Sequence, residues 1–204
     1  MSTPTAASAD RIRAAWRAAH EPVPGAPRWA RRAAYAVPLV VLPATLWRLP
    51  LVFSEEAGPG EAAYVVLLSV VSELLAFTAV GMVAGWGERF PRWVPWLRGR
   101  RVPTPVAVFP ASVGAVLLTA LWTWIFAAHF AGLTLRGDPI PADYPTQAGG
   151  WQAAVFYACY LPLLLWGPLL AAVTWAYWRR RRLSSPHTAS ARDGGGPGSV
   201  SPAP

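Results

Sequence analysis

The chain has 204 residues, of which 54% are hydrophobic and only 14% are charged, and its net charge is +8. This composition excludes an ordinary soluble domain, because the apolar residues gather in four long blocks. A single cysteine, Cys159, excludes both an internal disulfide and a paired-thiol redox centre.

All 18 basic residues are arginine, and most of them flank the apolar blocks. Strong positive charge can indicate a nucleic-acid partner, but arginines at the ends of apolar runs are what membrane topology requires. We therefore expect no nucleic-acid binding. The sequence predicts an all-α membrane protein with four transmembrane helices, at about 33–53, 62–86, 104–130 and 151–178.

Residues 1–32 form a basic arm that lacks the apolar core of a signal peptide. Within this arm, Asp10–His20 has a weakly amphipathic helical pattern with Trp16 on its apolar face. Two interpretations stay open. The segment is either a short helix lying on the inner leaflet or a tail that only carries topology charge.

The first predicted span, Ala33–Phe53, contains three prolines and has Arg48 near its end. Proline kinks a membrane helix, but neighbouring helices can satisfy the freed carbonyl groups. Arg48 lies about 7 Å from the end of the run by helix rise, so its side chain is expected to extend to the membrane interface. The acidic connection 54–61 is too short for anything but a turn.

The second predicted span, Ala62–Trp86, carries Glu73 about 18 Å from its start by helix rise, near the bilayer centre. A charged carboxylate there costs about 2.5–3.5 kcal/mol, so Glu73 is expected to be neutral, paired or in contact with water. It is a candidate coupling group of a small transporter. The alternatives are an ion pair with Arg48 and a packing residue that is hydrogen-bonded to Ser69 or Ser72, or to Thr119 and Thr123 of the third span.

The same span contains Gly81 and Gly85 in a small-xxx-small spacing. This spacing on one helix face allows a second helix to approach closely, although chance produces it often in glycine- and alanine-rich chains. We treat Gly81 and Gly85 as candidate helix-packing residues.

The loop 87–101 alternates arginines with aromatic residues between two membrane spans. Indole rings favour the headgroup level, and guanidinium groups pair with lipid phosphates. We therefore expect contact with lipid headgroups from Arg89, Arg92, Trp93, Trp96, Arg98, Arg100 and Arg101.

The stretch Phe90–Pro110, FPRWVPWLRGRRVPTPVAVFP, resembles a basic loop in small multi-pass membrane proteins of actinobacteria. In those proteins an FPRW-x-P…GRRVP loop joins two spans. The resemblance implies the same layout of spans around the loop here. It carries over no catalytic residue, because that group has none assigned.

The third run, Val102–Phe130, begins among prolines and ends near His129. This histidine has no partner for a metal or haem, since the other two histidines lie outside the predicted spans, so we interpret it as an interfacial polar residue. The fourth span, Trp151–Trp178, contains a proline–glycine break at 162–168 that predicts a kink or an unwound binding segment. Residues 179–204 are expected to form a disordered tail after a four-arginine stop signal.

The arginines predict the orientation. Six precede residue 33, five lie in the loop 87–101 and five follow Trp178, whereas the two opposite connections contain only Arg136. The positive-inside rule therefore places both termini and the middle loop in the cytoplasm of a cell-membrane protein. Four spans joined by short connections predict an antiparallel helical bundle.

No nucleotide-binding, zinc-protease or serine-hydrolase motif is present, so we expect no enzyme, no cofactor and no metal. The favoured function is an accessory membrane component that binds a partner protein, with anionic lipids as further partners on the cytoplasmic side. The alternative is a small proton- or cation-coupled transporter, or a channel-like subunit, that uses Glu73. An enzyme acting on a lipid-soluble substrate is a third, weaker possibility.

Overall fold

The computed structural model describes residues 13, 23, 25–53, 58–88, 102–142, 144–147 and 149–183. Within these ranges the chain is mostly helical and forms no strand. Four helical segments are long and apolar enough to cross a membrane, as predicted for a multi-pass membrane protein. They are Arg28–Pro50, Pro59–Gly81, Thr104–Phe130 and Gly150–Leu183.

Helix α2 spans Arg28–Val52 and begins directly after Pro27, five residues before the predicted start. Three arginines of the predicted arm therefore belong to the helix. The helix continues through Pro38, Pro43 and Pro50, each of which lacks the N–H group that would bond the carbonyl four residues earlier. Packing against neighbouring helices keeps such a segment helical.

Helix α3 spans Pro59–Gly81 and carries a proline and Glu61 in its first turn, where a fixed φ and a negative charge both favour helix initiation. It ends before the predicted Trp86, and Gly85 already belongs to the 3₁₀ turn η1, Gly85–Glu88. The prediction that Gly81 and Gly85 share one helix face is therefore wrong. Gly81 instead contacts Gly87, where an added Cβ would lie 2.0 Å from the Gly81 carbonyl oxygen.

Helix α4 spans Thr104–Phe130, as predicted. The fourth span is divided into helix α5 (Gly150–Tyr160), the 3₁₀ segment η2 (Leu161–Leu165) and helix α6 (Trp166–Leu183). Pro162 and Pro168 lie in and just after η2, and neither can donate a backbone hydrogen bond. The predicted proline–glycine break is therefore present as a short 3₁₀ segment.

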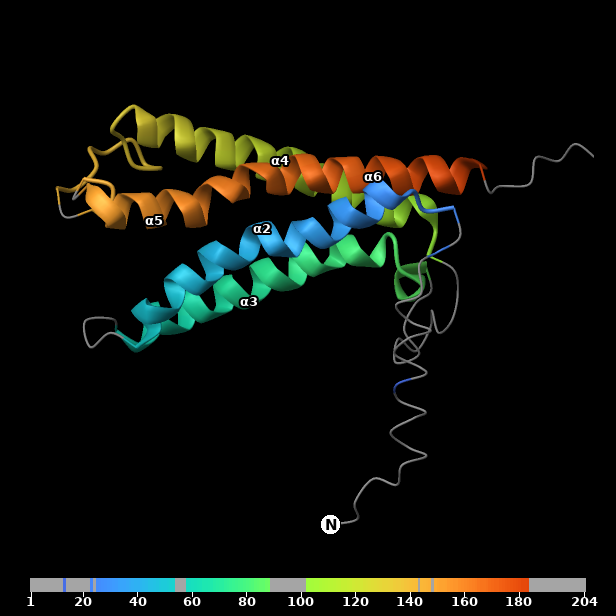
Figure 1. The fold of residues 1–204 in the computed structure, drawn as a ribbon, viewed down its shortest axis with the longest axis horizontal. Helices are drawn as coiled ribbons and strands as arrows, with labels where there is room; N and C mark the ends of the chain where they lie inside the picture. Colours follow the sequence, from blue (N-terminus) through green and yellow to red (C-terminus); the bar gives the residue numbers. More distant parts are fainter. Residues whose placement is uncertain are drawn as a thin grey trace, which may run out of the picture.

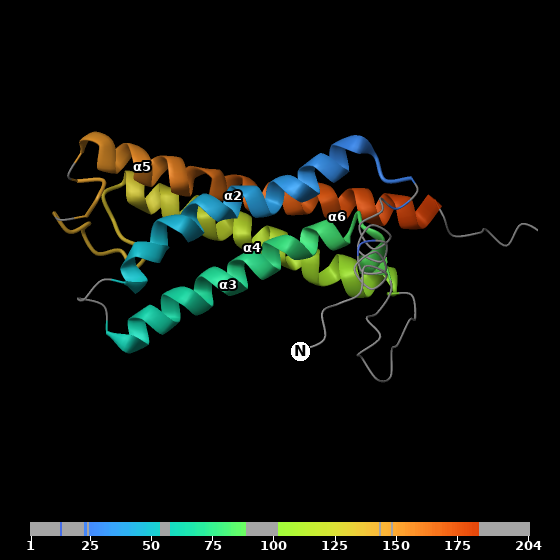
Figure 2. The same ribbon diagram turned by 60° about the horizontal axis from the view of Figure 1, so that its bottom comes forward.

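The helices run antiparallel to their neighbours along the chain (Figure 1). We call the end where α2 begins and α6 finishes the arginine-rich end, and the opposite end, with residues 131–149, the loop end. Helix α2 packs between α3 and α6, and α4 packs along α6. Figure 2 shows the same helices turned by 60°.

The α3 and α4 helices do not pack against each other. No Cα atom of Pro59–Gly81 lies within 8 Å of a Cα atom of Thr104–Phe130. The sequence prediction of a bundle in which successive helices are neighbours holds for α2–α3 and for α4 with the fourth span. It does not hold for α3–α4, which the long stretch 82–103 connects.

Small residues determine how closely the packed helices approach. The buried face of α2 carries Ala34, Val37, Val41 and Ala44, and that of α3 carries Ala76 and Ala79. Between α4 and α6, a Cβ added to Gly167 would lie 2.1 Å from Thr119 Oγ1. One face of helix α4 therefore packs tightly against α6.

Arginines of α6 tie the helices together at the arginine-rich end. The Arg180 side chain is buried and donates a hydrogen bond from its terminal nitrogen to the Met82 carbonyl at 3.3 Å. Arg181 donates to the Val102 carbonyl, just before α4. The predicted stop signal therefore also has a structural role, because it fixes the end of α3 and the start of α4 to α6.

Candidate functional site

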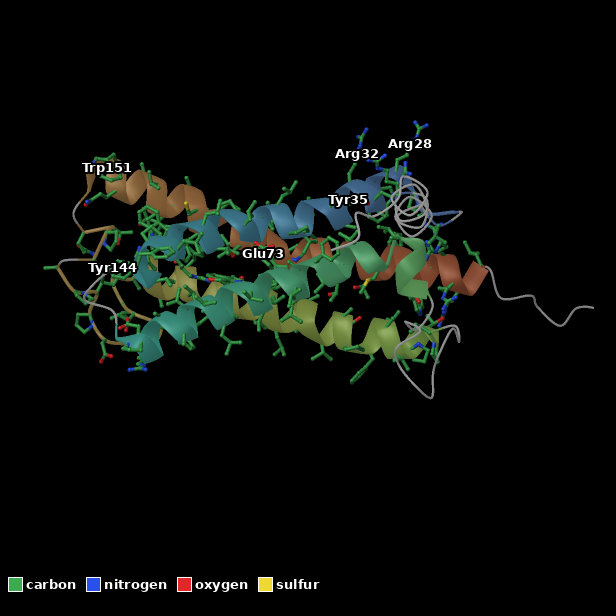
Figure 3. The ribbon with its side chains drawn as sticks, turned by 90° about the horizontal axis from the view of Figure 1, so that it is seen from below. Arg28, Arg32, Tyr35, Glu73, Tyr144 and Trp151 are labelled. Atoms are coloured by element: carbon green, nitrogen blue, oxygen red, sulfur yellow. The ribbon has the colours of Figure 1, made fainter. Side chains whose placement is uncertain are left out.

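Glu73 lies on the middle of α3 and is half-buried (Figure 3). Its carboxyl group lies near the Thr45 side chain of α2, whose hydroxyl donates a hydrogen bond to the Val41 carbonyl at 3.4 Å. The carboxyl oxygen Oε1 is buried and has no hydrogen-bond partner. The Ser69 hydroxyl, one helical turn earlier on α3, is also buried without a partner. The threonine that lies near Glu73 thus belongs to the first span rather than to the third span, whose helix does not pack on α3.

Arg48 lies one turn after Thr45 on α2 but does not pair with Glu73. Its Nε donates a hydrogen bond to the Tyr160 hydroxyl at 3.3 Å, and its guanidinium group lies 5.5 Å from the centroid of the Tyr160 ring. The possible Arg48–Glu73 ion pair is therefore not formed. Arg48 extends to the end of α5 rather than only to the membrane interface.

Tyr160 is the residue at which three elements meet, and the sequence patterns did not single it out as functional. Its ring centroid lies 6.5 Å from that of Trp122 on α4 and 4.5 Å from that of Phe156 on α5. The Trp122 indole nitrogen is buried and has no hydrogen-bond partner. Glu73 Oε1, Ser69 Oγ and Trp122 Nε1 are thus buried polar atoms without a partner, as is the Tyr177 hydroxyl. Such atoms call for a hydrogen-bonding partner.

His129 forms part of an aromatic cluster near the loop end. Its Nε2 lies 3.3 Å from the Tyr157 hydroxyl, and its ring stacks on Phe156 with 5.8 Å between centroids. Tyr144, from the connection between α4 and α5, lies 6.0 Å from the same imidazole. Among the described residues no group of histidines, cysteines and carboxylates is placed to hold a metal ion.

The hydroxyl of Tyr144 is the titrating group of this cluster that lies outside the helices. Burial raises the pKa of Tyr144 above its ordinary value of 10.0, and proximity to Tyr160 raises it further. Tyr144 is therefore a neutral phenol at neutral pH.

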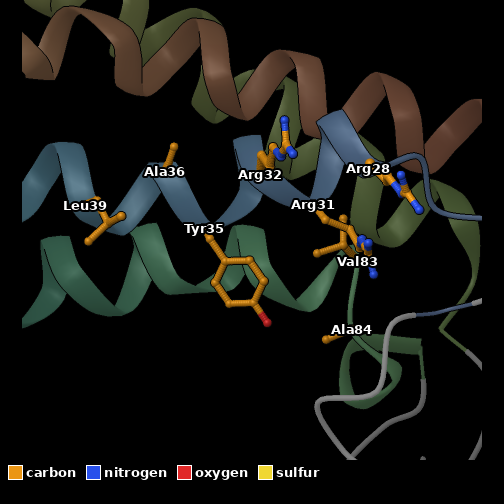
Figure 4. Close-up of a pocket in the computed structure, with 8 residues that line it drawn as sticks. All are labelled: Arg28, Arg31, Arg32, Tyr35, Ala36, Leu39, Val83 and Ala84. Carbon is orange, nitrogen blue, oxygen red and sulfur yellow. The ribbon is translucent and has the colours of Figure 1, made fainter.

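A basic pocket of about 560 Å³ lies at the arginine-rich end (Figure 4). Its charged wall is formed by Arg28, Arg31 and Arg32 of α2, and Val83 and Ala84 line another side. From the sequence, these arginines indicate only the orientation of the chain in the membrane. Their spacing of three and four residues places them on one side of a helix, which is the signal that could have revealed the pocket.

A groove of about 540 Å³ lies between α3 and α4, where these helices leave a gap. Its α4 wall carries Ala107, Ala111 and Gly114, which recur at intervals of four and three residues and so face the same way. Trp166 and Leu170 of α6 also line it. The groove is mostly apolar, and its polar lining side chains are Thr78 and Tyr177, of which the Tyr177 hydroxyl is buried without a hydrogen-bond partner.

The loop predicted to contact lipid headgroups lies outside the described residues. This applies to Arg89, Arg92, Trp93, Trp96, Arg98, Arg100 and Arg101, and also to most of the basic arm and to the tail after Leu183. The headgroup contacts and the disordered tail stay predictions.

No protein-family profile, curated protein or solved structure matches this chain. The resemblance to small actinobacterial membrane proteins therefore stays a prediction.

Proposed function

We propose that this chain is a non-enzymatic membrane component that binds a transmembrane helix of a partner protein along the groove between α3 and α4. The observation that carries this proposal is the separation of α3 from α4 where each packs on another helix. A four-helix membrane bundle normally pairs its helices around a common core. Here one side of the bundle is left with a groove.

The groove has the chemistry that membrane helix association uses. Within a bilayer, helices associate through close packing at small residues, because lipid tails are as apolar as leucine. Ala107, Ala111 and Gly114 place three such residues along one side of α4, and Gly81 lies on the opposite wall. A partner helix can therefore approach the α4 backbone closely.

The proposed orientation places the arginine-rich end in the cytoplasm together with both termini. The supporting feature is the distribution of arginine, because α2 begins and α6 ends with clusters of three and four arginines respectively. Only Arg136 stands on the connection at the loop end.

Site-specific photo-crosslinking in native membranes tests the proposed partner. A photoreactive residue at Leu117, which lines the groove and is exposed, is expected to give one discrete crosslinked protein. The same residue at Val116 is the matched control, because Val116 is exposed but lies on the other side of α4, outside the groove. Ala111→Phe should abolish the Leu117 product. Equal products from both positions, or no effect of Ala111→Phe, would contradict the proposal.

A second function is favoured by the unsatisfied Oε1 of Glu73 and the unsatisfied Ser69 hydroxyl one helical turn away. A carboxyl oxygen buried without a partner at mid-helix is the arrangement found in proton- and cation-coupled transporters. Purified protein in liposomes that contain a pH-sensitive dye would then collapse an imposed proton gradient, and Glu73→Gln would remove that flux. Equal proton flux in protein-free liposomes, in liposomes with the wild type and in liposomes with Glu73→Gln would contradict this alternative.

A further inference from the structure

A second groove runs along the opposite side of α4, between α4 and α6. It consists of two hollows of about 690 and 420 Å³ that share Val108, Ser112 and Trp178. Because these three residues line both hollows, the two form one continuous surface. We call this surface the α4–α6 groove.

The two ends of the α4–α6 groove differ in chemistry. At the arginine-rich end it is lined by Arg181 and Arg182 together with Thr104. The Arg182 guanidinium lies 4.0 Å from the ring centroid of Trp178, and Arg181 donates a hydrogen bond to the Val102 carbonyl. Both cations are therefore held in place at the groove. No carboxylate lines either hollow.

The rest of the groove is an apolar trough, because small residues stand where larger side chains would fill it. Ala115 and Ala120 of α4 and Ala171 of α6 line this part. From Thr104 to Ala120 the groove follows α4 for about 24 Å by helix rise. One leaflet of a bilayer, headgroups included, is about 20–22 Å thick.

We propose that the α4–α6 groove binds one anionic phospholipid from the leaflet at the arginine-rich end. The phosphate lies at Arg181 and Arg182, and an acyl chain follows the trough past Ser112 toward Ala120. Guanidinium groups recognise phosphate oxygens through charge-assisted hydrogen bonds. Charge at one end and an apolar trough one leaflet long fit a phospholipid better than a partner helix, which would not need the charged end. This site is separate from the groove between α3 and α4 and does not depend on the proposed function.

Native mass spectrometry of the purified full chain tests the proposal. The probes are palmitoyl-oleoyl phosphatidylglycerol and the neutral phosphatidylcholine with the same chains. We expect the wild-type protein to bind the anionic lipid more tightly. Arg182→Gln should weaken that binding about fivefold and leave the neutral lipid unchanged, as expected for one arginine near a lipid phosphate.

Two matched control variants distinguish binding in the groove from a general attraction of the lipid to positive charge. Arg179→Gln removes the same charge from the same cluster, but Arg179 lines neither hollow. Val113→Phe adds a ring to the exposed neighbour of Ser112, also outside both hollows. Both should bind as wild type. If Arg179→Gln weakened binding as much as Arg182→Gln, charge alone would account for it and the proposal would be overturned.

Blocking the trough tests the position of the acyl chain. Ser112→Phe fills the junction of the two hollows and should reduce binding of the anionic lipid at least as much as Arg182→Gln. Ala120→Leu, at the far end, is a milder second variant if Ser112→Phe does not fold. Unchanged binding in a folded variant, or displacement of the lipid by millimolar inorganic phosphate, would show that no acyl chain occupies the groove.

Discussion

Gly167 of α6 lies directly against Thr119 of α4, with no space for even a methyl group between them. A Cβ at Gly167 would lie 2.1 Å from Thr119 Oγ1 and 2.7 Å from the Ala115 carbonyl oxygen. This contact holds α4 on α6, and α4 faces α3 only across the groove between them. The groove remains between α3 and α4 because α4 packs on α6 whereas α3 packs on α2.

The first prediction is that Gly167→Ala destabilises the protein by about 1–3 kcal/mol, because the added methyl group forces the two helices apart. Thermal unfolding in nanodiscs would measure the loss. Gly114→Ala is the matched control, because a Cβ at Gly114 would make an ordinary contact of 3.9 Å with Leu170. Equal stability of the two variants would show that α4 and α6 are less tightly packed than described.

The second prediction concerns the Arg48–Tyr160 hydrogen bond. Tyr160→Phe keeps the ring beneath the guanidinium group but removes the hydroxyl, and should cost about 1.5–3 kcal/mol, the range for hydrogen bonds to charged groups. Tyr157→Phe, which loses only a contact with a histidine, should cost less. A double-mutant cycle with Arg48→Ala would give zero coupling if the bond is absent in the membrane.

Much of the fold could be predicted from the sequence, because span length and apolar content follow directly from bilayer thickness. The end of α4 at Phe130 and the break near Pro162 were both predicted from local patterns. The end of α3 was not. Gly81 stops that helix five residues early because the chain turns tightly on Gly87, a contact that no helical spacing reveals.

Helix pairing and the polar interior could not be predicted from one sequence. The partner of Arg48 lies 112 residues away on α5, and the threonine near Glu73 lies on the first span rather than the third. Both facts depend on which helices are neighbours. That choice depends on side-chain fit at positions such as Gly167, where the sequence shows only a glycine next to a proline.

The third prediction is that Glu73→Gln inserts and folds like the wild type. An amide can keep the contact with Thr45, and it avoids the cost of about 2.5–3.5 kcal/mol for a charge at the membrane centre. Glu73→Lys places a positive charge at the same depth in the membrane and should reduce insertion strongly. The two variants are compared with the wild type by their yield in the membrane fraction and by their thermal stability. A large loss with Glu73→Gln would mean that Glu73 is held as a carboxylate by a cation.

The fourth prediction is a pH dependence at the loop end. The pKa of Tyr144 is raised in the folded state, so the phenol contributes stability that is fully present below its unfolded pKa of about 10. This stability is lost as the pH rises through the higher folded value. An ultraviolet difference titration between wild type and Tyr144→Phe would show one tyrosine ionising above the normal range. Ionisation at the ordinary value would contradict the burial of Tyr144 against His129 and Phe156.

Disulfide trapping between α3 and α4 tests the central claim most directly, in a Cys159→Ser background in native membranes. Leu75 and Leu117 stand on the two walls of the groove, and cysteines there should not form a bond, because disulfides need Cα atoms within about 7 Å. Cysteines at Gly114 of α4 and Leu170 of α6, two helices that do pack on each other, are the positive control and should crosslink faster. Rapid crosslinking of the Leu75 and Leu117 positions would mean that α3 packs on α4, and the groove proposed for a partner helix would not exist.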